Sequence, residues 1–211
     1  MTKYLVEFIG TFFLVATIGS VVIGNPGGQG DMAPLAIGAM LMVMVFAGGH
    51  VSGAHYNPAV TLAVYLRGKC PLTDVGPYIA AQALGAVGAA AAVLYLKEYP
   101  EIKAGEPDVP RALLAEFLFT FALCYVVLNV ATANGTSGNS FYGLAIGFTV
   151  LAGAYSVGSI SGGAFNPAVA LGISVLGLSA WQNIWIFLLA NFAAASLAAG
   201  VFRYVTREDK V

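Results

Sequence analysis

The sequence predicts an all-α membrane protein in which six transmembrane helices and two half-helices form two inverted repeats. Three observations support this fold class: the chain is 59% hydrophobic and only 9% charged, it contains six long apolar runs, and its second half repeats its first. Soluble domains usually contain about 25% charged residues, so this chain has too few charges for a water-exposed surface. We therefore expect a single transmembrane domain over residues 1–211.

Six apolar runs have the length of a transmembrane helix. They cover residues 4–23, 33–50, 77–96, 113–132, 141–159 and 183–204. Each run is close in length to the ~20 residues that cross the hydrocarbon core of a bilayer as an α-helix. The first run contains Glu7 and has no small-residue cleavage site behind it, so we do not expect a cleaved signal peptide.

Basic residues between the runs predict the orientation, because cytoplasmic loops are enriched in Lys and Arg. A cytoplasmic N-terminus places six of them inside (Lys3, Arg67, Lys69, Arg203, Arg207 and Lys210) and three outside (Lys97, Lys103 and Arg111). We therefore expect both termini in the cytoplasm, an extracellular loop over residues 98–112, and location in the plasma (inner) membrane. The net charge of −1 predicts no nucleic-acid partner, and Cys70 and Cys124 are expected to stay reduced.

The second half of the chain repeats the first at an offset of 109 residues. Matching pairs include Glu7 and Glu116, Thr11 and Thr120, Ser52 and Ser161, Asn57 and Asn166, and "LAIG" at 35–38 and 144–147. The repeats extend over about residues 4–97 and 113–206. Each repeat holds three spans, an odd number, so the second repeat enters the membrane from the opposite side. Inverted repeats of this kind place the functional site at their interface near the bilayer midplane.

Each repeat contains the tetrapeptide "NPAV", followed by a short apolar run that ends at a glycine. The runs cover residues 58–66 and 167–176, and at 1.5 Å per residue they are about 14 Å long, roughly half of a bilayer core. Proline suits the first position of a helix, and asparagine suits the N-cap because its side-chain oxygen accepts a bond from the first turn. We therefore expect two half-helices, with the amide NH₂ of each asparagine left free.

Half-helices that enter from opposite faces meet N-terminus to N-terminus at the centre of the protein. This arrangement brings Asn57 and Asn166 together with two positive helix-dipole ends. A water molecule that accepts bonds from both amides turns its own hydrogens along the pore, which interrupts proton conduction, while the dipoles repel cations. The pattern predicts a pore for neutral solutes.

These motifs resemble those of the aquaporin and aquaglyceroporin family over the whole chain: two NPA boxes, each preceded by Ser-Gly, with a glutamate 50 residues upstream. The resemblance implies a passive channel for water and small uncharged solutes that assembles as a homotetramer in the lipid bilayer. It assigns the pore centre to the box residues Asn57, Pro58, Ala59, Asn166, Pro167 and Ala168. We expect no cofactor and no enzymatic activity, because the sequence offers no nucleophile and base pair and no metal triad.

Ionisable side chains near the boxes have a structural and a functional interpretation. Glu7 and Glu116 are the carboxylates within the predicted spans, and we expect them to accept hydrogen bonds from the loops before the boxes rather than to form a proton relay. His50 and His55 flank the first loop and are expected to brace it or to position its carbonyls, with a titrating gate as the alternative. Their counterparts in the second repeat are a serine and an alanine, which excludes a symmetric metal site.

The family resemblance also implies a second constriction on the extracellular side. It is formed by one residue of the second span, one of the fifth, one just before the second box and one just after it. Counting from the boxes gives Ile37, Ala154, Gly163 and Val169, with Tyr155 or Ser156 as alternatives in the fifth span. Water-specific members of the family typically have Phe, His, a small residue and Arg at these four positions. Because Val169 stands where the arginine is expected, we predict a wider and less polar filter.

Two other functions fit the duplicated, broken-helix pattern. A facilitator mainly for glycerol, urea, ammonia or hydrogen peroxide shares every feature described so far. An ion-coupled secondary transporter also uses inverted repeats with broken helices. It needs a charged or coordinating group at the midplane, where this sequence offers amides.

Overall fold

The computed structural model describes residues 1–23 and 32–206, which form eight α-helices and no β-strand. The helices are α1 (Thr2–Val22), α2 (Ala33–Ser52), α3 (Pro58–Leu66), α4 (Leu72–Leu96), α5 (Val109–Thr132), α6 (Tyr142–Ser161), α7 (Pro167–Val175) and α8 (Ile184–Val205). Six of them are long and apolar enough to cross a membrane, and α3 and α7 are the short ones. The predicted fold class is confirmed. Two basic residues used for the orientation, Arg207 and Lys210, lie outside the described residues.

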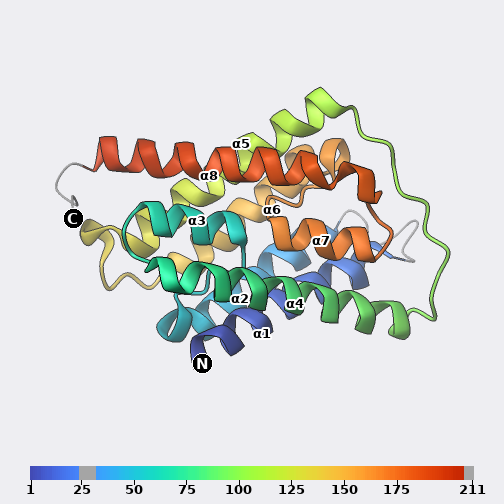
Figure 1. Ribbon diagram of the computed structural model, residues 1–211, viewed down its shortest axis with the longest axis horizontal. Helices are drawn as coiled ribbons and strands as arrows, with labels where there is room; N and C mark the ends of the chain where they lie inside the picture. Colours follow the sequence, from blue (N-terminus) through green and yellow to red (C-terminus); the bar gives the residue numbers. More distant parts are fainter. Residues whose placement is uncertain (24–31, 207–211) are drawn as a thin grey trace.

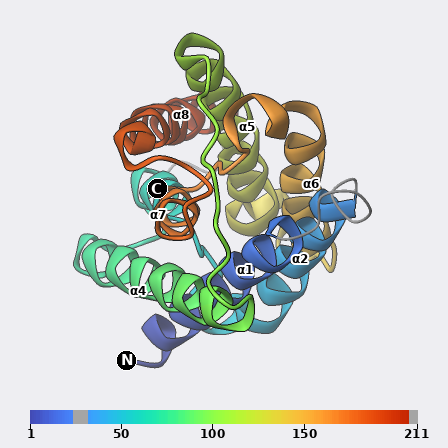
Figure 2. The ribbon, with the colours of Figure 1, turned by 90° about the vertical axis from the view of Figure 1, so that its right-hand side faces the viewer.

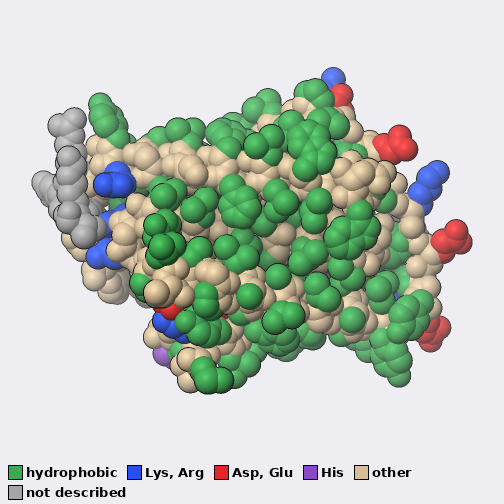
Figure 3. Space-filling view, viewed as in Figure 1, with side chains coloured by type: hydrophobic (Ala, Val, Ile, Leu, Met, Phe, Trp, Pro, Cys, Tyr) green, Lys and Arg blue, Asp and Glu red, His purple; other side chains and the backbone are tan. Residues whose placement is uncertain are grey.

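The surface has the charge distribution of a protein that spans a bilayer. Figure 3 shows hydrophobic side chains over the middle of the long axis, with the Lys, Arg, Asp and Glu side chains gathered toward the two ends. In Figure 1, α1 begins and α8 ends toward the left, whereas the segment between α4 and α5 lies at the right. We call these the inner end and the outer end of the molecule.

Two spans begin earlier than their apolar runs predict. α4 starts at Leu72, so that Pro77 lies inside the helix and not at its first residue. α5 starts at Val109, where the Asp108 carboxylate caps the helix by accepting a hydrogen bond from the Arg111 N–H at 3.1 Å. Each first turn contains a charged residue, Asp74 or Arg111, and so falls outside the apolar run, although the helix itself begins at its cap.

Two pairs of equivalent helices keep the 109-residue offset in the structure. α2 and α6 both contain 20 residues and begin 109 positions apart, and so do the 9-residue helices α3 and α7. Gly38 and Gly147 are equivalent and face each other where α2 crosses α6. A Cβ on Gly38 would lie 2.8 Å from the Gly147 carbonyl oxygen, and a Cβ on Gly147 would lie 2.5 Å from that of Gly38. This mutual backbone contact lies on the pseudo-two-fold axis between the repeats.

The half-helices α3 and α7 lie among the long helices and point toward each other. In Figure 1, α3 occupies the left half of the molecule and α7 the right half. α3 packs against α4, α5 and α8, and α7 packs against α1, α4 and α8. The N-termini of the half-helices also contact each other, which brings both NPA boxes to the centre of the molecule.

The segment between α4 and α5 runs across the outer end. Figure 2 shows this segment in green, crossing the end of the molecule in front of α7. Gly105 pairs with Ser179 in an isolated β-bridge, which ties the segment to the turn after α7. Any cavity that opens at the outer end is therefore bordered by this segment.

Candidate functional site

The two half-helices start with the same capped turn. Asn57 Oδ1 accepts a hydrogen bond from the Ala59 N–H at 2.8 Å, and Asn166 Oδ1 accepts one from the Ala168 N–H at 2.9 Å. A proline follows each asparagine at the first helical position, where its missing N–H leaves no donor unpaired. The helices thus use the side-chain oxygens and leave the NH₂ groups for other partners.

Each asparagine donates a hydrogen bond to the other repeat. Asn57 Nδ2 donates to the Phe165 carbonyl oxygen at 2.9 Å, and Asn166 Nδ2 donates to the Tyr56 carbonyl oxygen at 2.8 Å. The expectation of a wholly free NH₂ is therefore wrong, because one of its two protons is bonded to the opposite loop. The second proton has no partner among the described residues, and both asparagines line a central cavity.

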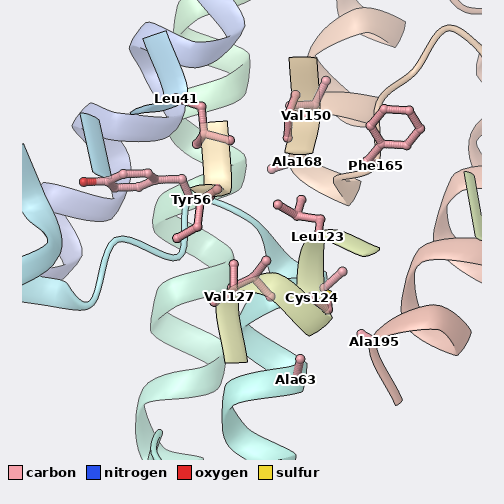
Figure 4. Close-up of a cluster of buried hydrophobic side chains, with 14 of the residues drawn as sticks. Leu41, Tyr56, Ala63, Leu123, Cys124, Val127, Val150, Phe165, Ala168 and Ala195 are labelled. Atoms are coloured by element: carbon pink, nitrogen blue, oxygen red, sulfur yellow. The ribbon is translucent and has the colours of Figure 1, made fainter. Parts of the chain in front are cut away.

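The residues just before the boxes, Tyr56 and Phe165, have a left-handed backbone, with φ of 51° and 47°. This conformation is costly for a residue with a side chain and persists only where its surroundings fix it. It turns each carbonyl toward the asparagine of the other repeat, and Figure 4 shows the two rings pointing in opposite directions. The Tyr56 ring occupies the space above Gly10 and Gly48, where a Cβ would overlap it, and its hydroxyl donates to the Met44 carbonyl at 2.9 Å.

A fully buried glutamate in each repeat fixes the loop before the box. Glu7 accepts four hydrogen bonds, from Ser52 Oγ at 2.7 Å, the His55 N–H at 2.9 Å, the Tyr56 N–H at 2.6 Å and Gln82 Nε2 at 2.8 Å. Glu116 accepts the four equivalent bonds, from Ser161 Oγ at 2.8 Å, the Ala164 N–H at 2.9 Å, the Phe165 N–H at 2.7 Å and Asn191 Nδ2 at 3.1 Å. Non-helical backbone at membrane depth needs such internal partners, so the geometry fits the expected role in loop support.

Sequence reasoning did not single out Gln82 and Asn191, the two amides that contact the glutamates. They are equivalent positions of the repeats, and both side chains are fully buried. A signal was present, because each repeat carries an amide at the same place in its third span. Without a known partner, however, a single polar residue in a helix rich in alanine gave no indication of its role.

Three cavities follow one another through the molecule. The central cavity has about 70 Å³, which is room for a few waters, because one water needs at least ~10–15 Å³ of such space. The outer cavity has about 440 Å³, is bordered by the α4–α5 segment, and shares Ile37 and Ala154 with the central one. The inner cavity has about 290 Å³ and shares His55 and Val127 with the central one. Because neighbouring cavities share lining residues, they form a row along the long axis, which we call the path.

The outer part of the central cavity has mainly aliphatic walls. The residues expected at the outer constriction, Ile37, Ala154, Gly163 and Val169, all line the central cavity. The alternatives Tyr155 and Ser156 are exposed on α6. Leu41 and Val150, which Figure 4 shows near the box residues, continue the apolar lining.

The two histidines occupy different places. His55 is 9% exposed, its Nδ1 lies 3.1 Å from Thr61 Oγ1, and the residue lines both the central and the inner cavity. His50 is exposed at the end of α2, at the rim of another cavity of the inner end. Within the described part of the chain no hydrogen bond joins His50 to the first loop, so the structure provides no bracing contact for it.

Six membrane-spanning helices around a row of cavities, with two half-helices meeting at its centre, define a membrane channel. The family model described as "Major intrinsic protein" matches residues 1–202. The chain belongs to this family of integral membrane proteins. It is a passive channel for water and small solutes.

Several relatives are similar over nearly the whole length of this chain. Aquaporin NIP1-1 of Oryza sativa subsp. japonica is 37% identical, with 99% of this chain and 75% of the relative aligned. Glycerol uptake facilitator protein-like 6 of Lactiplantibacillus plantarum is 36% identical, with 99% and 100% aligned. Nodulin-26 of Glycine max is 35% identical, with 100% and 80% aligned. The structure of the aquaglyceroporin from Plasmodium falciparum has the same fold, with a TM-score of 0.80, 24% identity, and coverage of 99% of this chain and 95% of that one.

Proposed function

We propose that the paired NPA boxes form the centre of the channel that excludes ions and protons. The proposal rests on the reciprocal contact of Asn57 and Asn166, in which each amide keeps one N–H for the central cavity. A water molecule that accepts both N–H groups points its own hydrogens toward the two ends of the path, and this breaks the hydrogen-bonded chain along which protons move. The N-termini of α3 and α7 add positive potential at the same place and repel cations.

We propose further that Ile37, Ala154, Gly163 and Val169 form a wide, apolar outer constriction. Alanine and glycine occupy little of the cross-section, and valine offers no hydrogen-bond donor that replaces the hydration of a solute. Small uncharged solutes such as glycerol or urea therefore meet a low barrier beside water. The similarity to a protein named as a glycerol uptake facilitator supports this second solute class.

The assembly and the orientation are also proposals. Family membership supports a homotetramer. The described basic residues support cytoplasmic termini in a plasma (inner) membrane, because Lys3, Arg67, Lys69 and Arg203 lie at the inner end, and Lys97, Lys103 and Arg111 lie at the outer end. The excess at the inner end is typical of a cytoplasmic face.

Stopped-flow light scattering on proteoliposomes tests the proposed function. A sucrose gradient reports water, glycerol and urea gradients report the larger solutes, and an enclosed pH dye reports protons. We expect fast water flux, measurable urea or glycerol flux, and no proton flux above that of empty vesicles. Proton flux through the parent channel that matches its water flux would contradict the proposed centre.

A substitution at the centre gives a second test of the same proposal. Asn166→Asp replaces the amide donor by a charged acceptor next to the Tyr56 carbonyl, so we expect it to admit cations or to prevent folding, and Asn57→Asp to do the same. A well-folded Asn166→Asp channel with ordinary water permeability and no cation leak would overturn the mechanism.

A further inference from the structure

A chain of hydrogen bonds links Glu7 to the pore-lining His55. Gln82 Nε2 donates to Glu7 at 2.8 Å and to Thr61 Oγ1 at 3.0 Å. Thr61 Oγ1 also lies 3.1 Å from the Asn57 carbonyl oxygen and 3.1 Å from His55 Nδ1. Thr61 and Gln82 are both fully buried, so water does not compete for these contacts.

The second repeat has no such connection to the pore. Asn191 Nδ2 donates to Glu116 and, at 2.8 Å, to Thr120 Oγ1 on α5. The positions equivalent to Thr61 and His55 are Ala170 and Ala164. The duplicated architecture therefore supports a polar side chain beside the path in one repeat only.

The direction of each bond in the first repeat follows from the number of available protons. Glu7 accepts hydrogen bonds from Ser52 Oγ and two backbone N–H groups, and Gln82 completes this set with its NH₂ toward Glu7 and Thr61. The reverse orientation would set Gln82 Oε1, which has no partner among the described residues, against a carboxylate oxygen. A hydroxyl has one proton and two lone pairs. Thr61 accepts from Gln82 and donates to the Asn57 carbonyl, so its contact with His55 is a hydrogen bond only if Nδ1 carries the proton.

We propose that Gln82 and Thr61 hold His55 in its neutral Nδ1-protonated form and thereby present Nε2 to the pore as a bare hydrogen-bond acceptor. A neutral imidazole has one donor and one acceptor nitrogen, and the partner of one determines the other. Nε2 makes no hydrogen bond to a described residue; it lies beside Gly53, which lines the inner cavity, and His55 is among the residues that line both the central and the inner cavity. Gln82 and Thr61 are positioning residues, because they act through His55.

This assignment places hydrogen-bond donors and an acceptor in a fixed order along the path. It rests on the proposed function, because the path must be the conducting pore. Amide donors of Asn57 and Asn166 face the central cavity, and the acceptor of His55 follows at the junction with the inner cavity. Within the central cavity, the described lining residues on the outer side of the boxes carry aliphatic side chains or none, and Glu106 and the serines lie farther out, in the wide outer cavity. A solute rich in N–H groups, such as urea, finds its side-chain acceptor after the centre, on the inner side.

Nitrogen-15 solid-state NMR on histidine-labelled proteoliposomes tests the tautomer without reference to permeation. The chain contains two histidines, so the His50→Gln variant leaves the signals of His55 alone. We expect a protonated Nδ1 and an unprotonated Nε2. A protonated Nε2 with a bare Nδ1 would overturn the inference, and this measurement needs no change in the network itself.

Variants of the hydroxyl test the positioning role. Thr61→Val removes the acceptor of Nδ1, so we expect protonated Nε2 to gain population, whereas Thr61→Ser keeps the parent spectrum. Thr120→Val is the matched control, because it removes the hydroxyl that accepts from Asn191 without touching the path. An unchanged His55 tautomer in well-folded Thr61→Val would refute the role of the hydroxyl.

The permeation readout is the ratio of urea to water permeability. We expect Thr61→Val to lower this ratio by about two- to tenfold, the range that one hydrogen bond corresponds to, and Thr120→Val to keep it at the parent value. A parent channel that conducts water but shows the reverse tautomer overturns this inference and leaves the proposed function intact. A parent that does not conduct water overturns the proposed function itself.

Discussion

Replacing Glu116 with alanine removes the shared acceptor of four buried hydrogen-bond donors. Ser161 Oγ and the Ala164 N–H donate to Oε1, and the Phe165 N–H and Asn191 Nδ2 donate to Oε2. A buried donor left unpaired costs about 1–3 kcal/mol, so even the lower limit gives roughly 4 kcal/mol for the four donors. This is a large share of the ~5–15 kcal/mol by which folded domains are typically stable. We therefore expect Glu116→Ala to lower the midpoint of thermal unfolding in detergent strongly.

The glutamine variant separates the contribution of the carboxylate oxygens to stability from that of side-chain volume. Glu116→Gln keeps one oxygen that accepts two of the four bonds and places an NH₂ against the other two donors. We expect its unfolding midpoint to lie between those of the parent and Glu116→Ala, and the Glu7 variants to follow the same order. Glu101→Ala, at an exposed position of the α4–α5 segment, is the control and should leave the midpoint unchanged. A Glu116→Ala protein as stable as the parent would show that the loop does not depend on this carboxylate.

Three further predictions concern the filter, the packing and a helix cap. Val169→Arg should reduce urea or glycerol flux more than water flux in stopped-flow measurements, because the guanidinium occupies cross-section that a file of waters can spare; an unchanged ratio would place the filter elsewhere. Gly48→Ala should lower stability by about 1–3 kcal/mol, since its Cβ overlaps the Tyr56 hydroxyl, whereas Gly200→Ala, with open space around it, should not. Asp108→Ala should cost about 0.5–2 kcal/mol through loss of the α5 cap, measured by detergent unfolding; no loss would mean that the cap is dispensable.

The fold could be predicted because two independent signals agreed. Apolar length located the spans, and the 109-residue offset required their inversion, so that Asn57 and Asn166 had to meet. The first residues of α4 and α5 were harder to predict, because hydropathy indicates the hydrocarbon region and not the point at which a helix is capped. The cap itself was readable as Asp108 before Val-Pro, a pattern typical of a helix start.

The site could be predicted at the level of residues but not of bonds. Asn57, Asn166, Glu7 and Glu116 were recognisable from their repetition, since a duplicated polar residue in an apolar span needs an explanation. The crossing of each NH₂ to the opposite carbonyl was not, because it depends on a left-handed φ that no local sequence pattern at a tyrosine or phenylalanine predicts. The contacts of the two histidines could not be predicted either, because His50 lies in the last turn of α2 whereas His55 lies in the loop after that helix.

The exchange of hydrogen bonds between Asn57 and Asn166 has the form of an isologous contact, in which each partner gives what it receives. A single half-chain carrying one NPA box would make both bonds at once in an antiparallel pair of identical copies, as in a two-fold symmetric dimer. When two such halves are fused into one chain, each half can change independently at positions whose residues do not bond to the other half. The two halves differ in this way at His55 and Thr61, whose equivalent positions in the other half are Ala164 and Ala170.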